Sequence, residues 1–139
     1  MLKLINNHLY NIFELYNEND KIILYVKMIA TKYDDDYINY RTDLLQLYND
    51  TYKDFERKIY IIIDINTLKS KLIKMVKNEL RYFKENRDLL EFIVHKIYVL
   101  KEKSFLTTII KLLKPFMFQS KVETVIKKNL EKSLVDILD

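Results

Sequence analysis

The pair of residues best placed to do chemistry in this chain is Glu91 and His95. On a helix, four-residue spacing puts a carboxylate and an imidazole on one face, where they could share a metal ion or a proton. Either site needs further ligands or a nucleophile, yet the only other histidine is His8 and the chain has no cysteine. Glycine-rich phosphate loops and hydrolase motifs are also missing from the sequence. We therefore predict no enzyme, no catalytic residue, no metal and no cofactor, and interpret the pair as a polar seam.

A second acidic feature is the triplet Asp34-Asp35-Asp36. Adjacent carboxylates on a helix point in different directions, whereas calcium loops use alternate positions and a glycine. The chain contains no glycine. The triplet therefore predicts a solvated segment.

Basic residues form a stripe that could meet phosphates. Its members are Lys74, Lys77, Arg81 and Lys84, with Lys127 and Lys128 later in the chain. Lysine outnumbers arginine by 20 to 4, which is typical of AT-rich coding and weakens arguments from lysine count. Because no aromatic residues are interleaved with the stripe, we predict no nucleic-acid partner. A basic helical nucleic-acid-binding protein stays open as an alternative.

The composition favours one helical domain spanning residues 1–139. Hydrophobic residues make up 49% of the chain, charged residues 32%, and proline occurs once. Tight hairpins usually need glycine for positive φ angles, so a chain without glycine is expected to be all-α. No apolar run approaches the roughly 20 residues that cross a bilayer.

The stretch Leu89–Leu100 is the most apolar in the chain, and only Glu91, His95 and Lys96 interrupt it. It predicts a buried central helix over about residues 87–103, surrounded by other helices. Apolar spacing of three and four predicts those neighbours, for a total of seven or eight helices. They cover about residues 2–16, 20–48, 52–62, 65–83, 104–113 and 122–138. The run IYIII at 59–63 is the best strand candidate, but its length and context favour a buried helix end.

This arrangement resembles the Bcl-2 fold, and in particular the poxvirus members of that family. Residues 79–92 can be laid on the first homology motif with a two-residue deletion and without its Trp and Gly. Ile29 and Asp34 fit the third motif, where bulky Tyr33 replaces a small residue. Ile63-Asp64-Ile65-Asn66 is similar to the segment that precedes the fourth helix in poxvirus members. The residues matched to the first motif are Glu79, Leu80, Arg81, Asn86 and Arg87.

The resemblance implies a viral inhibitor of apoptosis that holds pro-apoptotic helices of the Bim, Bak and Bax type in a surface groove. Arg87 would meet the ligand's aspartate, with Arg81 or Lys84 as substitutes, and Leu90 would form the floor. Tyrosines cluster between residues 33 and 52, as expected at an interface. The groove residues implied are Tyr37, Leu45, Tyr48, Tyr52, Phe55, Leu72, Met75, Val76, Arg87 and Leu90.

Two other functions remain open from the sequence. Poxvirus proteins of the same fold also inhibit innate immune (NF-κB) signalling through protein–protein contacts, and the basic nucleic-acid binder is the alternative from a different class. The resemblance places the protein in the host cytoplasm, as a monomer or homodimer. A C-terminal tail beyond Asp139 could carry the full-length protein to the mitochondrial outer membrane.

Overall fold

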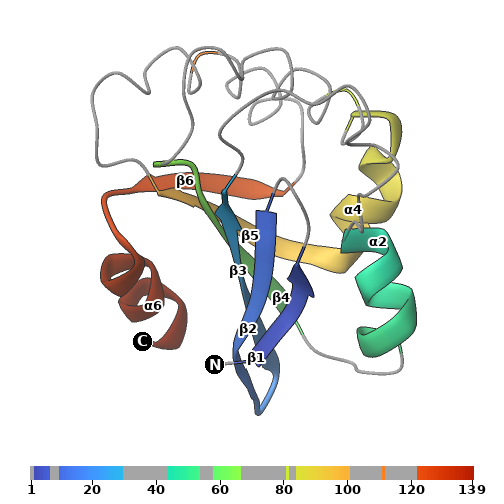
Figure 1. The fold of residues 1–139 in the computed structure, drawn as a ribbon, viewed down its shortest axis with the longest axis horizontal. Helices are drawn as coiled ribbons and strands as arrows, with labels where there is room; N and C mark the ends of the chain where they lie inside the picture. Colours follow the sequence, from blue (N-terminus) through green and yellow to red (C-terminus); the bar gives the residue numbers. More distant parts are fainter. Residues whose placement is uncertain are drawn as a thin grey trace.

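The computed structural model describes residues 2–6, 10–29, 44–53, 58–66, 81, 84–100, 111 and 122–139. They form one six-stranded sheet in which the strands follow each other in sequence order, as Figure 1 shows. The strands are β1 (Leu2–Asn6), β2 (Tyr10–Glu18), β3 (Lys21–Met28), β4 (Lys58–Asp64), β5 (Val94–Leu100) and β6 (Glu123–Lys127).

The sheet is mixed. Strands β1, β2 and β3 form an antiparallel meander, and β3, β4, β5 and β6 run parallel to one another. Each parallel pair needs a crossover segment to bring the chain back to the same end of the sheet. The four parallel strands are therefore separated by long stretches of sequence, and their pairing is non-local.

Short helices lie on both faces of the sheet (Figure 1). Helix α2 (Leu44–Leu47), the π-helical turn η1 (Tyr48–Tyr52) and α4 (Arg87–Ile93) lie on one side, which we call the helix face. Helix α6 (Leu130–Leu138) lies on the other side, the α6 face. Each face has its own apolar cluster: Ile22, Leu24, Ile61 and Val99 belong to the first, and Ile23, Ile62, Tyr98 and Ile137 to the second.

The prediction of an all-α, Bcl-2-like bundle is wrong, because most of the described residues lie in strands. The run at 59–63 is part of β4, which parallel strands flank on both sides. A strand covered on both faces reads as a continuous apolar run rather than an alternating one. Such a run cannot be told from a buried helix by periodicity alone.

The predicted central helix over residues 87–103 is also wrong in its second half. Helix α4 ends at Ile93, and the chain continues directly into β5. Strand β5 is rich in β-branched and aromatic residues, which pack well on a pleated surface. Residues 101–103 lie outside the described part of the chain.

Among the other predicted helices, some of the described residues lie in strands and others are helical. Residues 2–16 form β1 and most of β2, and the start of the predicted second helix is β3. In the last predicted helix, residues 123–127 are β6, whereas Leu130–Leu138 is helical, with the Asn129 side chain accepting from the Lys132 amide at 3.0 Å. The triplet Asp34-Asp35-Asp36 and most of the helices predicted over 104–113 and 65–83 lie outside the described residues. Within those two helices, Lys111 and Arg81 are described and helical.

The boundary predicted between the first two helices is a hairpin turn between β2 and β3. It consists of Asn19 and Asp20, and Asn19 has a φ angle of 57°. Among non-glycine residues, asparagine enters this left-handed region most readily. Asparagine therefore supplies the positive φ that a glycine-free chain was expected to lack.

The turn makes a testable prediction about Asn19. Asn19→Gly should leave the free energy of unfolding within about 0.5 kcal/mol of the wild type, because glycine accepts positive φ. Asn19→Val should cost about 1–2 kcal/mol, because a Cβ branch clashes in the left-handed region. Urea unfolding of the two variants measures the difference, and equal stabilities would contradict this turn.

Candidate functional site

The ten residues predicted to line a partner-helix groove are only partly described. Tyr48 and Tyr52 lie in η1, the second fully buried, and Leu90 is buried in α4. Arg87 is exposed at the start of α4, where its Nε lies 3.9 Å from Glu91 Oε1. The groove therefore remains a prediction. Its described members pack beside a sheet, and not among the helices of a bundle. Leu45 is described only as backbone of α2, and Tyr37, Phe55, Leu72, Met75 and Val76 lie outside the described residues.

Glu91 and His95 lie on different elements, since Glu91 belongs to α4 and His95 to β5. The exposed His95 ring packs edge-on against Tyr60, with 5.1 Å between ring centroids. Burial, then the charges of Lys58 and Lys96, lower the pKa of His95. Within the described ranges, no three His, Cys, Asp or Glu side chains gather closely enough to hold a metal ion.

A row of side chains crossing the helix face forms a different candidate site. Strand pairing aligns its five residues on neighbouring strands from β2 to β6. The three in the middle are apolar and buried, with at most 7% of their surface exposed. The two at the ends are polar. In order across the sheet, the row reads Glu14, Leu24, Ile61, Ile97 and Thr124.

Both polar ends of the row carry a buried oxygen atom without a hydrogen-bond partner in the described part of the chain. These atoms are Glu14 Oε1 and Thr124 Oγ1. Asn17 Oδ1, on the same strand as Glu14, is also buried without a hydrogen-bond partner in the described residues. Four strand spacings separate the ends of the row, which corresponds to about 19 Å. A buried polar atom left unpaired costs roughly 1–3 kcal/mol, and a charged one more.

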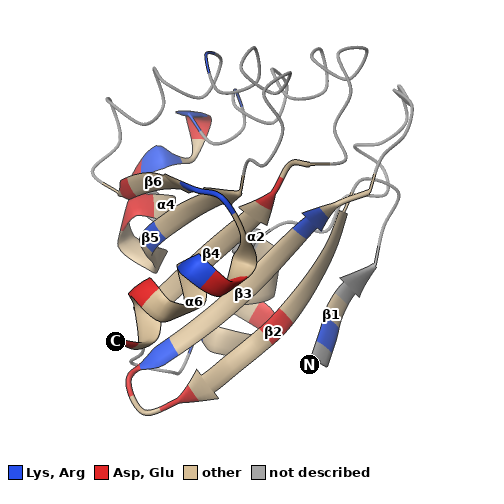
Figure 2. Ribbon diagram, turned by 90° about the vertical axis from the view of Figure 1, so that its left-hand side faces the viewer, with Lys and Arg blue, Asp and Glu red and all other residues tan. Residues whose placement is uncertain are grey.

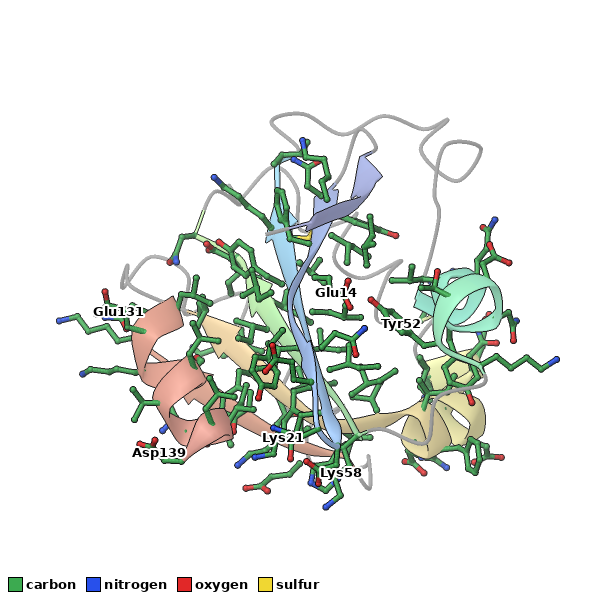
Figure 3. The ribbon with its side chains drawn as sticks, turned by 90° about the horizontal axis from the view of Figure 1, so that it is seen from below. Glu14, Lys21, Tyr52, Lys58, Glu131 and Asp139 are labelled. Carbon is green, nitrogen blue, oxygen red and sulfur yellow. The ribbon has the colours of Figure 1, made fainter. Side chains whose placement is uncertain are left out.

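A tyrosine from the helical layer, Tyr52, stands beside the Glu14 end of this row. Figure 3 shows Glu14 on the sheet and Tyr52 on η1 pointing toward one another. Burial of Tyr52, then the negative charge of Glu14 and a hydrogen bond to the Glu14 side chain, raise the pKa of the tyrosine hydroxyl, so the unpaired oxygen of this carboxylate is Oε1 alone. This hydroxyl therefore stays protonated and stands close to a carboxylate in an otherwise apolar layer.

The surroundings of the Glu14–Thr124 row are apolar. Leu47, Tyr52 and Ile93 from the helical layer are buried against the sheet here. Four more apolar side chains pack against the same cluster and remain partly exposed: Leu4, Val26, Tyr48 and Ile63. The site thus combines partly accessible apolar surface with hydrogen-bonding groups that have no protein partner in the described residues.

The opposite face of the sheet is closed by α6. The Tyr98 hydroxyl donates a hydrogen bond to Asp136, and Lys96 Nζ lies 3.3 Å from the same carboxylate. At the end of α6, Lys21 Nζ donates to the Ile137 carbonyl at 2.7 Å. The hydrogen bond from Tyr98, aided by Lys96, lowers the pKa of Asp136. These contacts hold α6 on the sheet, and we assign them a structural role.

The buried tyrosine of this network predicts a pH dependence. Burial and the hydrogen bond to Asp136 raise the pKa of Tyr98 from 10.0 to about 12. The folded state therefore keeps a proton that the unfolded state loses, so the resulting stability is complete below pH 10 and declines from pH 10 to 12. Tyr98→Phe should make that decline shallower by about 1.4 kcal/mol per pH unit. Denaturant unfolding at several alkaline pH values measures the slope, and an unchanged slope would contradict the shift.

Neither Glu14 nor Thr124 was singled out from the sequence, although a signal for Glu14 was present. In a strand, Tyr10, Ile12 and Glu14 share one face. A carboxylate at an inward position of such an alternating pattern marks a conflict that points to function. Interpreted as a helix, the same residues put Glu14 on the solvent side. For Thr124 no comparable signal exists, because its partner strand is distant in sequence.

Comparison of the chain with protein-family models, with curated proteins and with solved structures finds no match. None of the described helices is long and apolar enough to cross a membrane.

Proposed function

We propose that this protein is a non-enzymatic binding protein for an elongated, largely apolar small molecule that carries a hydrogen-bond donor. The molecule lies on the helix face of the sheet, along the Glu14–Thr124 row. Its donor group meets the carboxylate of Glu14, and its apolar body lies against the aliphatic side chains of the sheet.

The observation that supports this proposal is the buried Glu14 oxygen with no partner in the described part of the chain. Natural proteins pair nearly all buried polar atoms, so an unpaired one calls for an explanation. A bound molecule with a donor satisfies the atom and offsets its desolvation. The nearby Tyr52 hydroxyl, kept protonated by burial and by Glu14, can add a second polar contact to the same group.

The shape of the ligand follows from the row. Three buried aliphatic side chains separate the polar ends by about 19 Å, so a chain-like apolar body with a small polar head fits better than a compact polar metabolite. Burial of each methylene group contributes about 0.8 kcal/mol. A hydroxyl or amine head suits Glu14, whereas a carboxylate head would bring two like charges together.

The experiment compares two probes of equal length, 1-dodecanol and dodecanoate, by thermal shift and calorimetry at pH 8. The alcohol should bind and raise the melting temperature, and the carboxylate should bind at least ten-fold more weakly. Glu14→Gln should remove most of that discrimination, because it removes the charge and keeps the shape. Glu18→Gln is the matched control, since Glu18 lies on the same strand and is exposed.

If neither probe binds up to its solubility limit, the proposal is overturned. Equal binding of the two probes would overturn it too, since Glu14 would then play no part. Inhibition of apoptosis and of innate signalling remain predictions from sequence resemblance, and the first of them depends on a helical groove that the described sheet does not provide. Calorimetric titration with Bim, Bak and Bax peptides tests the first of them.

A further inference from the structure

The α6 face extends past α6 toward β1. Helix α6 packs on β4 and β6, and its apolar cluster also takes in Ile23 of β3. Figure 2 looks onto this face and shows the ribbons of β2 and β3 beside α6, with β1 beyond them. The side chains that this part of the sheet presents form a second surface, which is independent of the Glu14–Thr124 row on the other face.

This surface carries two neighbouring aromatic rings, with a lysine over the first and a carboxylate at the second. Lys3 Nζ lies 5.5 Å from the centre of the Phe13 ring, and Phe13 stacks on Tyr25 with 6.1 Å between centroids. The Tyr25 hydroxyl donates to Asp64 Oδ2 at 2.5 Å, which fixes the orientation of its ring. Both rings are only partly buried. We call Lys3, Phe13, Tyr25 and Lys27 the aromatic platform.

Lys27 adds a second cation at the edge of the platform. It lies two residues after Tyr25 on β3, so both side chains stand on the same face, and its side chain is exposed. Its strand neighbour on β2 is Asn11, whose buried Oδ1 has no hydrogen-bond partner among the described residues. The strand neighbour of Lys27 on β4 is Asp64, whose carboxylate accepts hydrogen bonds from the Tyr25 hydroxyl and the Asn66 side chain. The platform thus offers two rings, two ammonium groups and an amide beside one carboxylate that the protein itself holds.

We propose that the aromatic platform binds single-stranded nucleic acid. Bases stack on partly exposed rings without regard to sequence, and lysines beside the rings meet the phosphates that link the bases. Lys3 is already held over Phe13 by cation–π attraction and can turn to a phosphate when a base takes its place. Here lysines flank two neighbouring aromatic rings, which the sequence stripe of Lys74, Lys77, Arg81 and Lys84 does not show.

The experiment measures fluorescence anisotropy of labelled oligo(dT) and oligo(U) of twelve nucleotides, titrated with the full chain at low salt. Phe13→Leu keeps the apolar volume but removes the stacking surface, so affinity should fall by about 5- to 150-fold. Lys27→Gln should weaken binding and reduce the slope of log affinity against log salt by about 0.7. A double-stranded oligonucleotide should bind more weakly, because its bases are already stacked.

Two control variants lie away from the platform. Phe92, with 80% of its surface exposed, is on α4 at the other side of the sheet, and Lys132 is exposed on α6. Phe92→Leu and Lys132→Gln should leave binding within two-fold of the wild type. The proposal is overturned if single strands do not bind at tens of micromolar protein. It is equally overturned if Phe92→Leu weakens binding as much as Phe13→Leu does.

Discussion

Replacing Glu14 by leucine is expected to make the ligand-free protein more stable and at the same time to abolish ligand binding. The free energy of unfolding should rise by about 1–3 kcal/mol, because an unpaired buried oxygen is exchanged for apolar atoms of similar size. Affinity for 1-dodecanol should fall at least ten-fold, because the head group loses its acceptor. When a residue serves function at the expense of stability, its replacement raises the free energy of unfolding and lowers ligand affinity, as expected here.

Tyr52 requires a second variant in this experiment, because its hydroxyl stands close to Glu14. Glu14→Leu could leave that hydroxyl poorly satisfied and mask part of the gain. The double variant Glu14→Leu/Tyr52→Phe should therefore be at least as stable as the single one. Glu18→Leu, on the exposed end of β2, should stay within 0.5 kcal/mol of the wild type. A loss of stability in both Glu14 variants would show that Glu14 Oε1 is paired within the protein, and would remove the basis of the proposed site.

The sequence identifies the buried segments of this protein better than their conformation. Leu89–Leu100 is indeed mostly buried, and so is IYIII at 59–63. Whether such a run is helix or strand depends on whether a partner strand lies beside it, and here the partners are 27 to 37 residues away. Local periodicity contains no information about a partner at that distance. Parallel pairing thus explains the wrong fold class.

The absence of glycine misled for a different reason. It predicts a chain without hairpins, yet Asn19 adopts positive φ and closes the turn between β2 and β3. The turn at Asn19 and Asp20 does coincide with the boundary predicted between the helices over 2–16 and 20–48, although the elements on either side are strands. Abundant asparagine can take the place of glycine in turns.

The candidate site was beyond prediction from sequence for a geometric reason. Glu14 and Thr124 are 110 residues apart and become the two ends of one row only through the pairing of five consecutive strands. The predicted groove residues, in contrast, were chosen by resemblance to a helical family. Of these, Tyr52 does lie at the new site, although it stands opposite a carboxylate on a strand instead of lining a helical groove.

The second large effect is expected from β4, whose adjacent residues face different layers. Ile61 belongs to the cluster beneath the helical layer, and Ile62, which is fully buried, belongs to the cluster beneath α6. Truncating either to alanine removes buried methyl groups and leaves a cavity, at a cost of about 2–4 kcal/mol each. Guanidinium unfolding should therefore show two large and similar losses at neighbouring positions.

Control variants on the same strand sharpen this test. Lys58→Ala, at the exposed start of β4, should change the free energy of unfolding by no more than about 0.5 kcal/mol. Ile61→Ala should also weaken 1-dodecanol binding, because Ile61 lies in the Glu14–Thr124 row, whereas Ile62→Ala should not. A small loss at either isoleucine would mean that one face of β4 is open, contrary to a sheet covered on both sides. Similar losses of stability with different losses of binding would instead separate the face that holds the ligand from the face that α6 closes.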